Sequence, residues 1–157
     1  MEQAALARTD PAIGPDLSPT RFPAAGQVAA LKASYRALEP ALDLVATLFF
    51  RRLDEIAPEV RAMLPESEAA QHGQLKSSLA LAVASLDRFA DIHPALKLLG
   101  TRFRGLGVTE FHYGAVGEAL TWTLRHSLGS QWTPEVADAW TAFCTEIAEI
   151  MTGSSQP

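Results

Sequence analysis

Apolar residues recur at intervals of three and four positions along most of this chain, a spacing that predicts amphipathic helices. In one segment, for example, Leu96, Leu99, Phe103 and Leu106 fall on the same helical face. Six helices are predicted in this way: residues 27–39, the segment between Pro40 and Pro58, and residues 67–90, 94–104, 110–128 and 134–151. No useful stretch alternates between apolar and polar residues, so the pattern is typical of an all-α fold with short connections.

Local capping signals support two of these boundaries. Thr133-Pro134-Glu135 combines a capping hydroxyl, a proline at the first helical position and an acid that favours the helix dipole. Gly129 is expected to end the preceding helix, because glycine accepts the left-handed conformation that commonly follows a helix. The connection between the last two predicted helices is therefore short.

The first 25 residues differ in composition from the rest of the chain. Four prolines occur between residues 11 and 23, a density that prevents a continuous helix. We predict a proline-rich flexible leader over residues 1–25, a single helical domain over 26–152 and a frayed tail over 153–157.

Composition and charge exclude several classes of protein. The 157 residues carry a net charge of −5, and no basic run forms the positive face that nucleic acids require. No apolar run is as long as a membrane span, and the N-terminus does not resemble a signal peptide. One cysteine excludes an intrachain disulfide and favours a reducing compartment. A cytoplasmic protein is expected.

Several short motifs, in their order and spacing, resemble the globin family, in particular single-domain bacterial haemoglobins and the globin domain of flavohaemoglobins. They are Ala57-Pro58-Glu59-Val60, His112-Tyr113 with Val116-Gly117-Glu118, and Glu135-Val136-Ala137-Asp138-Ala139-Trp140. The resemblance covers about residues 27–151. It implies a globin fold of six to eight helices in a three-over-three arrangement, with haem handling O2 or NO.

The residues at the haem-binding positions differ from those of the family. Phe103 occupies the position of the proximal histidine, and a benzyl ring has no lone pair for iron. Leu64 falls where the family has a phenylalanine that packs on the porphyrin, although Met63 or Pro65 would fall there in a register shifted by one. Phe50 replaces the usual distal tyrosine. Phe103, Leu64 and Phe50 can pack against their neighbours, but none of them can coordinate iron or donate a hydrogen bond to a bound gas.

The distal and supporting positions show the same trend. Leu75 falls at the distal position, where histidine or glutamine is usual, and a shift of one residue would place Gln74 there. Tyr113 matches the tyrosine that orients the proximal histidine in flavohaemoglobins, but its glutamate partner would fall near Ser155. The residues expected to line the resulting apolar pocket are Phe49, Phe50, Leu64, Leu75, Leu79, Leu99, Phe103, Tyr113 and Val116.

Two hypotheses of function remain open from the sequence. The first is a haem-less globin without enzymatic activity, acting as a sensor or interaction module for an apolar or fatty-acyl ligand, a protein partner or a second copy. It expects no cofactor and no metal. The alternative keeps haem b and the O2 or NO role, with non-standard ligation through His72, one turn before Leu75.

Overall fold

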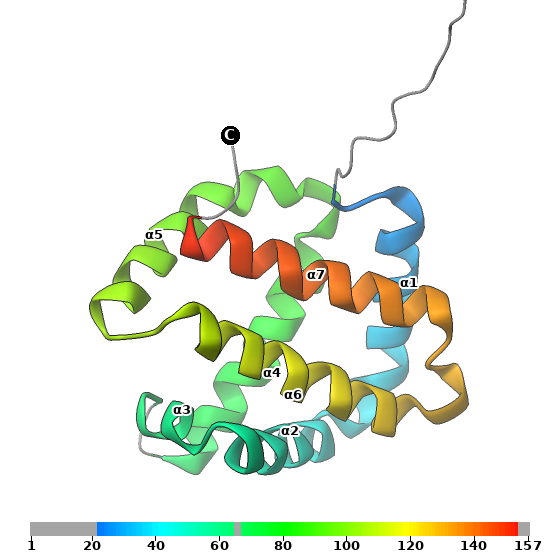
Figure 1. Ribbon diagram of the computed structural model, residues 1–157. Helices are drawn as coiled ribbons and strands as arrows, with labels where there is room; N and C mark the ends of the chain where they lie inside the picture. The colour runs from blue at the N-terminus through cyan, green and yellow to red at the C-terminus, as the bar shows by residue number, and fades with distance from the viewer. Residues whose placement is uncertain (1–21, 65–66, 154–157) are drawn as a thin grey trace, which may run out of the picture.

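The computed structural model describes residues 22–64 and 67–153, and these ranges contain helices and connections but no strand (Figure 1). The elements are α1 (Ala25–Leu38), η2 (Glu39–Ala41), α2 (Leu42–Ile56), α3 (Pro58–Ala62), α4 (Glu68–Ala84), η3 (Leu86–Ile92), α5 (His93–Gly105), α6 (Glu110–Leu128), η4 (Gly129–Gln131) and α7 (Pro134–Thr152). The prediction of an all-α fold is confirmed. Most of the predicted leader and tail, residues 1–21 and 154–157, lies outside the described residues.

The predicted helix over residues 67–90 is shorter in the structure. It ends as α4 at Ala84, and the 3-10 element η3 follows, with non-helical angles at Arg88 (φ −136°, ψ 45°). The hydroxyl of Ser85 donates a hydrogen bond to the Leu81 carbonyl at 2.8 Å, a local bond that competes with continuation of the helix. Pro94 then begins α5 in its first turn, where a missing N–H costs nothing.

The predicted caps around α7 are confirmed. The Thr133 side chain accepts a hydrogen bond from the Val136 amide at 3.3 Å, and Pro134 stands at the first helical position. Gly129 follows α6 at φ 56°, and Gly153 ends α7 in the left-handed conformation at φ 82°. The sequence therefore specifies the α6–α7 hairpin locally.

The main core lies where α1 and α2 pack against α6 and α7. Trp140 of α7 is fully buried, and its indole N–H donates to the hydroxyl of Ser34 in α1 at 2.9 Å. Ser34 in turn donates to the Ala30 carbonyl at 2.8 Å. Because both polar groups are paired, this buried contact ties α1 to α7 without an unsatisfied atom.

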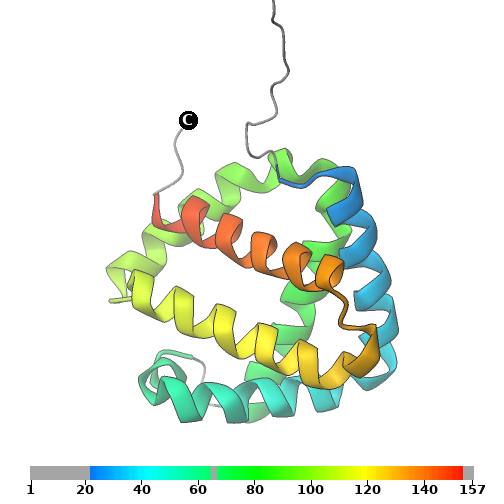
Figure 2. The ribbon, with the colours of Figure 1, turned by 45° about the vertical axis from the view of Figure 1, so that its right-hand side comes forward.

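Helix α5 approaches α7 more closely than any side chain would allow. A Cβ atom placed on Gly100 would lie 1.9 Å from the backbone oxygen of Met151. Figures 1 and 2 both show the C-terminal end of α7 beside α5. The main packing partners of α5 are α7 and η3, whereas α4 packs chiefly on α2. Helices α4 and α5 are therefore held by different neighbours.

Substitution of Gly100 tests this close approach. Gly100→Ala is expected to lower the free energy of unfolding by about 1–3 kcal/mol, because backbone must move to admit the methyl group. Gly73→Ala is the control, since Gly73 lies inside α4 and its added Cβ meets nothing within 4 Å. The control should gain about 0.5–1 kcal/mol. Urea denaturation measures the free energy of unfolding of both variants. Equal changes in the two variants would contradict the close contact between Gly100 and the Met151 backbone.

Candidate functional site

The first half of the predicted pocket, contributed by α2, α4 and the chain after α3, belongs to or touches the core. Phe49, Phe50 and Leu79 are buried members of the core cluster. Leu64 and Leu75 are half-buried and pack against that cluster. The structure therefore brings these five predicted residues together on one side of the interior.

The second half of the pocket, contributed by α5 and α6, stays outside the core cluster. Leu99, Phe103 and Tyr113 are half-buried, and Val116 is 36% exposed. Val116 keeps this exposure although Ala119 and Leu120, on the adjoining faces of α6, are buried. Phe103 thus does not fill the interior as a core aromatic, and apolar surface remains uncovered on this side.

We use the name crevice for the predicted pocket region between α4 and α5, and define it by Leu75, Leu79, Leu99, Phe103 and Val116. These residues come from α4, α5 and α6, and α4 and α5 are not main packing partners of one another. Leu79 is buried, the other two leucines and Phe103 are half-buried, and Val116 is exposed. Leu106, predicted to face inward, is instead 70% exposed, because α5 ends at Gly105.

His72 is the histidine placed on the α2 side of α4. Its imidazole ring stacks on Phe50, with centroids 5.3 Å apart and planes 12° apart. Its Nε2 atom is buried and has no hydrogen-bond partner, since the nearest carboxylate oxygen, on Glu68, lies 3.8 Å away. A buried imidazole nitrogen without a partner is a donor atom available to a ligand.

The aromatic ring of Phe50 also contacts a cation, the side chain of Arg61. The guanidinium of Arg61 in α3 lies 4.9 Å from the Phe50 ring centroid and donates to Asp54 at 2.8 Å. Phe50 thus interacts with both Arg61 and His72, which links α3, α2 and α4 at this end of the fold. No local pattern in the sequence predicts this contact, because the three residues lie on different helices.

The other three histidines have different roles in the structure. His93 begins α5 and contacts Phe89 edge to face, with centroids 5.1 Å apart. His112 accepts a hydrogen bond from the Thr109 amide at 2.9 Å and so helps to cap α6. His126 lies exposed near the end of α6 beside Trp122. None of them occupies the α5 face that carries Leu99 and Phe103.

Tyr113 also has a buried polar atom without a hydrogen-bond partner, its hydroxyl oxygen. Burial raises the pKa of the Tyr113 phenol, and the positive charge of Arg104 opposes that shift. Arg104 itself donates to the Thr152 carbonyl at 3.3 Å. The predicted absence of a glutamate partner concerns Ser155, which lies outside the described residues.

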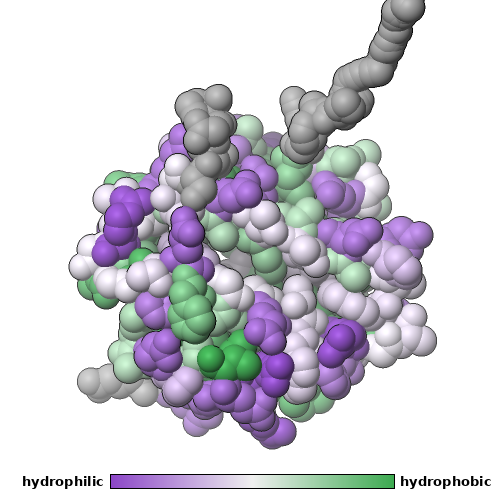
Figure 3. Space-filling view, viewed as in Figure 1, coloured by the Kyte–Doolittle hydropathy of each residue, from purple (hydrophilic) through white to green (hydrophobic). Residues whose placement is uncertain are grey.

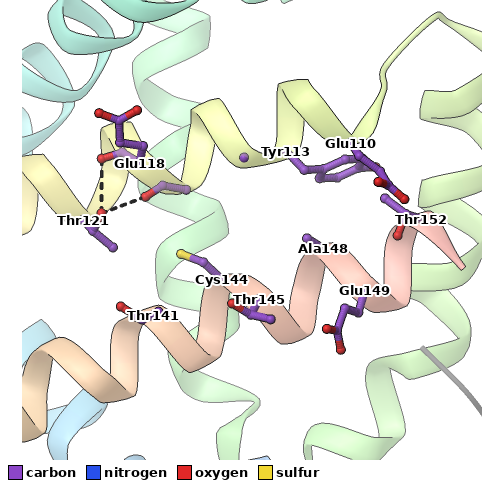
Figure 4. A pocket seen from close by; sticks show the side chains of 12 residues that line it. Glu110, Tyr113, Glu118, Thr121, Thr141, Cys144, Thr145, Ala148, Glu149 and Thr152 are labelled. Atoms are coloured by element: carbon purple, nitrogen blue, oxygen red, sulfur yellow. Dashed lines mark hydrogen bonds between the residues drawn. The ribbon is translucent and has the colours of Figure 1, made fainter. Parts of the chain in front are cut away.

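A second feature is a groove between α6 and α7, with a volume of about 590 Å³. In the space-filling view the surface over these two helices is hollowed between them (Figure 3). Cys144 and Ala148 of α7 and Tyr113 of α6 extend into the gap (Figure 4). Residues with small side chains, Gly114 and Gly117 on α6, are the sequence signal that could have predicted this groove.

Neither a metal cluster nor a membrane span is found in the part of the chain that the structure describes. Residues 22–64 and 67–153 contain no group of three His, Cys, Asp or Glu side chains placed to hold a metal ion. None of the described helices is both long enough and apolar enough to cross a bilayer.

The fold is a helical domain in which apolar residues of α4, α5 and α6 are left partly uncovered. A family model described as globin matches residues 49–151, about two thirds of the chain. The chain belongs to the globin family, which confirms the resemblance seen in the sequence.

The relatives found by sequence are flavohemoproteins. The protein of Bordetella parapertussis is 30% identical over 129 residues, covering 80% of this chain and 32% of the relative, and that of Bacillus subtilis is 25% identical over 126 residues. The chain therefore spans about a third of the length of these relatives. Since their name describes haem proteins, they favour the haem alternative over the expectation of no cofactor.

A solved structure confirms the globin fold. An engineered carbene transferase of Rhodothermus marinus, whose name describes it as a candidate nitric oxide dioxygenase, superposes with a TM-score of 0.70 at 23% identity. The matched region covers 83% of this chain and 92% of the carbene transferase chain. The expectation that the protein is not an enzyme is contradicted by the flavohemoprotein relatives. That expectation relied on the joint change of residues at the haem-binding positions, Phe50, Leu64, Leu75 and Phe103.

The single cysteine of the chain gives a direct test of the groove. Burial raises the pKa of the Cys144 thiol from 9.0 to about 12. At pH 8 its thiolate fraction should thus be about a thousandfold below that of the unfolded chain. The folded protein should react with methyl methanethiosulfonate about tenfold faster per pH unit between pH 8 and 11, while in urea the rate levels off above pH 9. If the reaction rate of the folded protein levelled off near pH 9, the Cys144 thiol would be exposed and the prediction would be wrong.

Proposed function

We propose that this globin binds haem in the crevice and handles O2 or NO at the bound group. The proposal is supported by the family, by the flavohemoprotein relatives and by the position of the crevice between α4 and α5. The observation that carries it is apolar surface left uncovered on α5 and α6. Leu99 and Phe103 are only half-buried, and Val116 is 36% exposed.

A flat apolar ligand would be stabilised by covering this surface. Removing apolar surface from water contributes about 25 cal/mol per Å². A porphyrin between α4 and α5 would be covered by Leu75 and Leu79 on one side and by Leu99 and Phe103 on the other. Val116 would contact its edge from α6. The walls contribute binding energy and exclude water, whichever residue holds the metal.

The chain's own candidate ligand to the iron is His72 rather than a residue of α5. Phe103 cannot coordinate, and no histidine shares its face of α5. The Nε2 atom of His72 is buried without a hydrogen-bond partner and lies one turn before Leu75 on α4. Bound haem supplies an iron atom that binds diatomic gases. Phe50 stacks on the imidazole of His72, with ring planes 12° apart.

A second candidate function is the binding of an apolar molecule without iron. Phe103 favours it, because a benzyl ring at the position of the proximal histidine contributes only packing. Leu75 at the distal position also favours this function, because its side chain can only pack against a ligand. The crevice would then bind an apolar molecule such as a fatty-acyl chain, in contact with the same apolar side chains.

Haemin titration separates the two functions. The protein should develop a Soret band that saturates at one haem per chain, and His72→Ala should weaken binding by about tenfold or more, since 1.4 kcal/mol corresponds to a factor of ten. His126→Ala is the matched control, because His126 is exposed on α6 and away from the crevice. Its titration should follow that of the unaltered protein.

Other outcomes of this titration lead to different conclusions. The absence of a Soret band at stoichiometric haemin would remove the haem function and leave the iron-free candidate. A band unaffected by His72→Ala would remove His72 as the ligand. Mass spectrometry of the purified protein after denaturation would then show whether an apolar molecule is retained.

Restoring the family's proximal ligand is a separate prediction. Phe103→His should tighten haem binding by about tenfold or more, because the imidazole would stand on the inward face of α5. Phe103→Leu controls for loss of the ring and should not tighten it. An affinity of Phe103→His no higher than that of Phe103→Leu would show that the crevice cannot place haem beside α5.

A further inference from the structure

The side of α5 that faces away from α7 carries exposed leucines. Leu98 is 67% exposed in the middle of the helix, and Leu106, directly after its end, is 70% exposed. Gly100 faces α7, and residues two positions away on a helix point to the opposite side, because each residue turns the helix by about 100°. Leu98 and Arg102 therefore point away from α7. We call exposed Lys97, Leu98, Arg102 and Leu106 the outer surface of α5.

This outer surface also carries positive charge without carboxylates. The segment between Asp91 and Glu110 contains three lysine or arginine residues and no acid. Cations of other helices and of η3 pair with carboxylates, as do Lys32, Arg52, Arg61, Lys76 and Arg88. Lys97 and Arg102 form no ion pair within residues 22–64 and 67–153. Because charges farther than about 10 Å are screened at 0.1 M salt, this side of α5 is locally positive on a chain of net charge −5.

The corner after α5 adds an aromatic side chain. Gly107, at φ 94°, turns the chain towards α6, and Phe111 in the first turn of α6 is 60% exposed. In the space-filling view, apolar and hydrophilic side chains lie next to one another along the left edge, where α5 runs to this corner (Figure 3). Of the two acids that border the segment, Asp91 pairs with Arg88 at 3.1 Å and Glu110 already has an interaction of its own.

The shape and the charge of the outer surface favour a bilayer over a protein partner. Leucines as exposed as Leu98 and Leu106 protrude from the surface, whereas a stable protein interface buries about 800 Å² of matching surface on each partner. A second copy in a twofold contact would place Arg102 and Lys97 against like charges. A bilayer needs no matching shape, and anionic lipids attract both cations.

We infer that the outer surface of α5 docks reversibly on bilayers that contain anionic lipids. Leu98 and Leu106 enter the head-group region, and Lys97 and Arg102 lie against the lipid phosphates. Phe111 adds apolar area at the same end of α5. The contact is peripheral, and it does not rest on the proposed haem function, since none of these residues belongs to the crevice.

Sedimentation with vesicles measures this docking on the full chain. The protein should sediment with vesicles of equal parts phosphatidylglycerol and phosphatidylcholine at an ionic strength of about 0.01 M. Binding should weaken severalfold at about 0.1 M, because the Debye length falls from about 30 Å to about 10 Å. Vesicles of phosphatidylcholine alone should bind much less, since they offer no negative surface.

Two pairs of matched variants locate the contact. Leu98→Ser should weaken binding about tenfold, because a leucine side chain would no longer leave water. Leu81→Ser is its control, since Leu81 is 66% exposed on α4. Arg102→Gln should weaken binding about fivefold, the effect of one cation near an anionic bilayer. Arg36→Gln removes an equally exposed cation of α1 that also forms no ion pair within the described ranges, and should leave binding unchanged.

Several results would overturn the inference. Absence of sedimentation with phosphatidylglycerol vesicles at low salt would exclude the docking, and equal binding to phosphatidylcholine would exclude the role of the cations. Equal effects of Leu98→Ser and Leu81→Ser would place the contact elsewhere. Binding to soluble polyglutamate as tight as to the vesicles would indicate an acidic protein instead. A dimer in sedimentation velocity that Leu98→Ser abolishes would assign this surface to a second copy.

Discussion

The approach of α5 to the last turn of α7 at Gly100 is the contact on which the shape of the interior depends. Glycine is required because a Cβ would meet the Met151 backbone at 1.9 Å. This contact holds α5 against α7, while α4 is held by α2 on the other side of the fold. Helices α4 and α5 are therefore held by different neighbours, and their apolar side chains do not form a main packing interface with one another.

The proposed haem site lies between these two helices, although Phe103 replaces the histidine that usually holds the iron. Phe103 takes the histidine position but does not join the core, so the substitution has not filled the interior. Phe50 of α2 and Leu79 of α4 are buried members of the core cluster. Two buried imidazole nitrogens have no hydrogen-bond partner, Nε2 of His72 on α4 and Nε2 of His93 at the start of α5. His72 is the proposed ligand because it lies one turn before Leu75 on α4.

The sequence predicted the helices, because apolar spacing and caps such as Thr133 are local signals. It overestimated the helix after residue 67, since a hydrogen bond from Ser85 and the angles at Arg88 interrupt it. It placed Leu106 inside, although α5 ends one residue earlier. The Gly100 contact and the stacking of His72 on Phe50 depend on tertiary geometry, and periodicity carries no information about either.

The most direct test of a haem-binding crevice is a methyl NMR spectrum recorded with and without one equivalent of haemin. The account predicts large shifts or broadening at Leu75, Leu99 and Val116, which line the crevice from α4, α5 and α6. The methyl groups of Leu44 and Leu81, exposed on the outer surface, should change little. Unchanged spectra at all five residues, or changes confined to Leu44 and Leu81, would contradict the account.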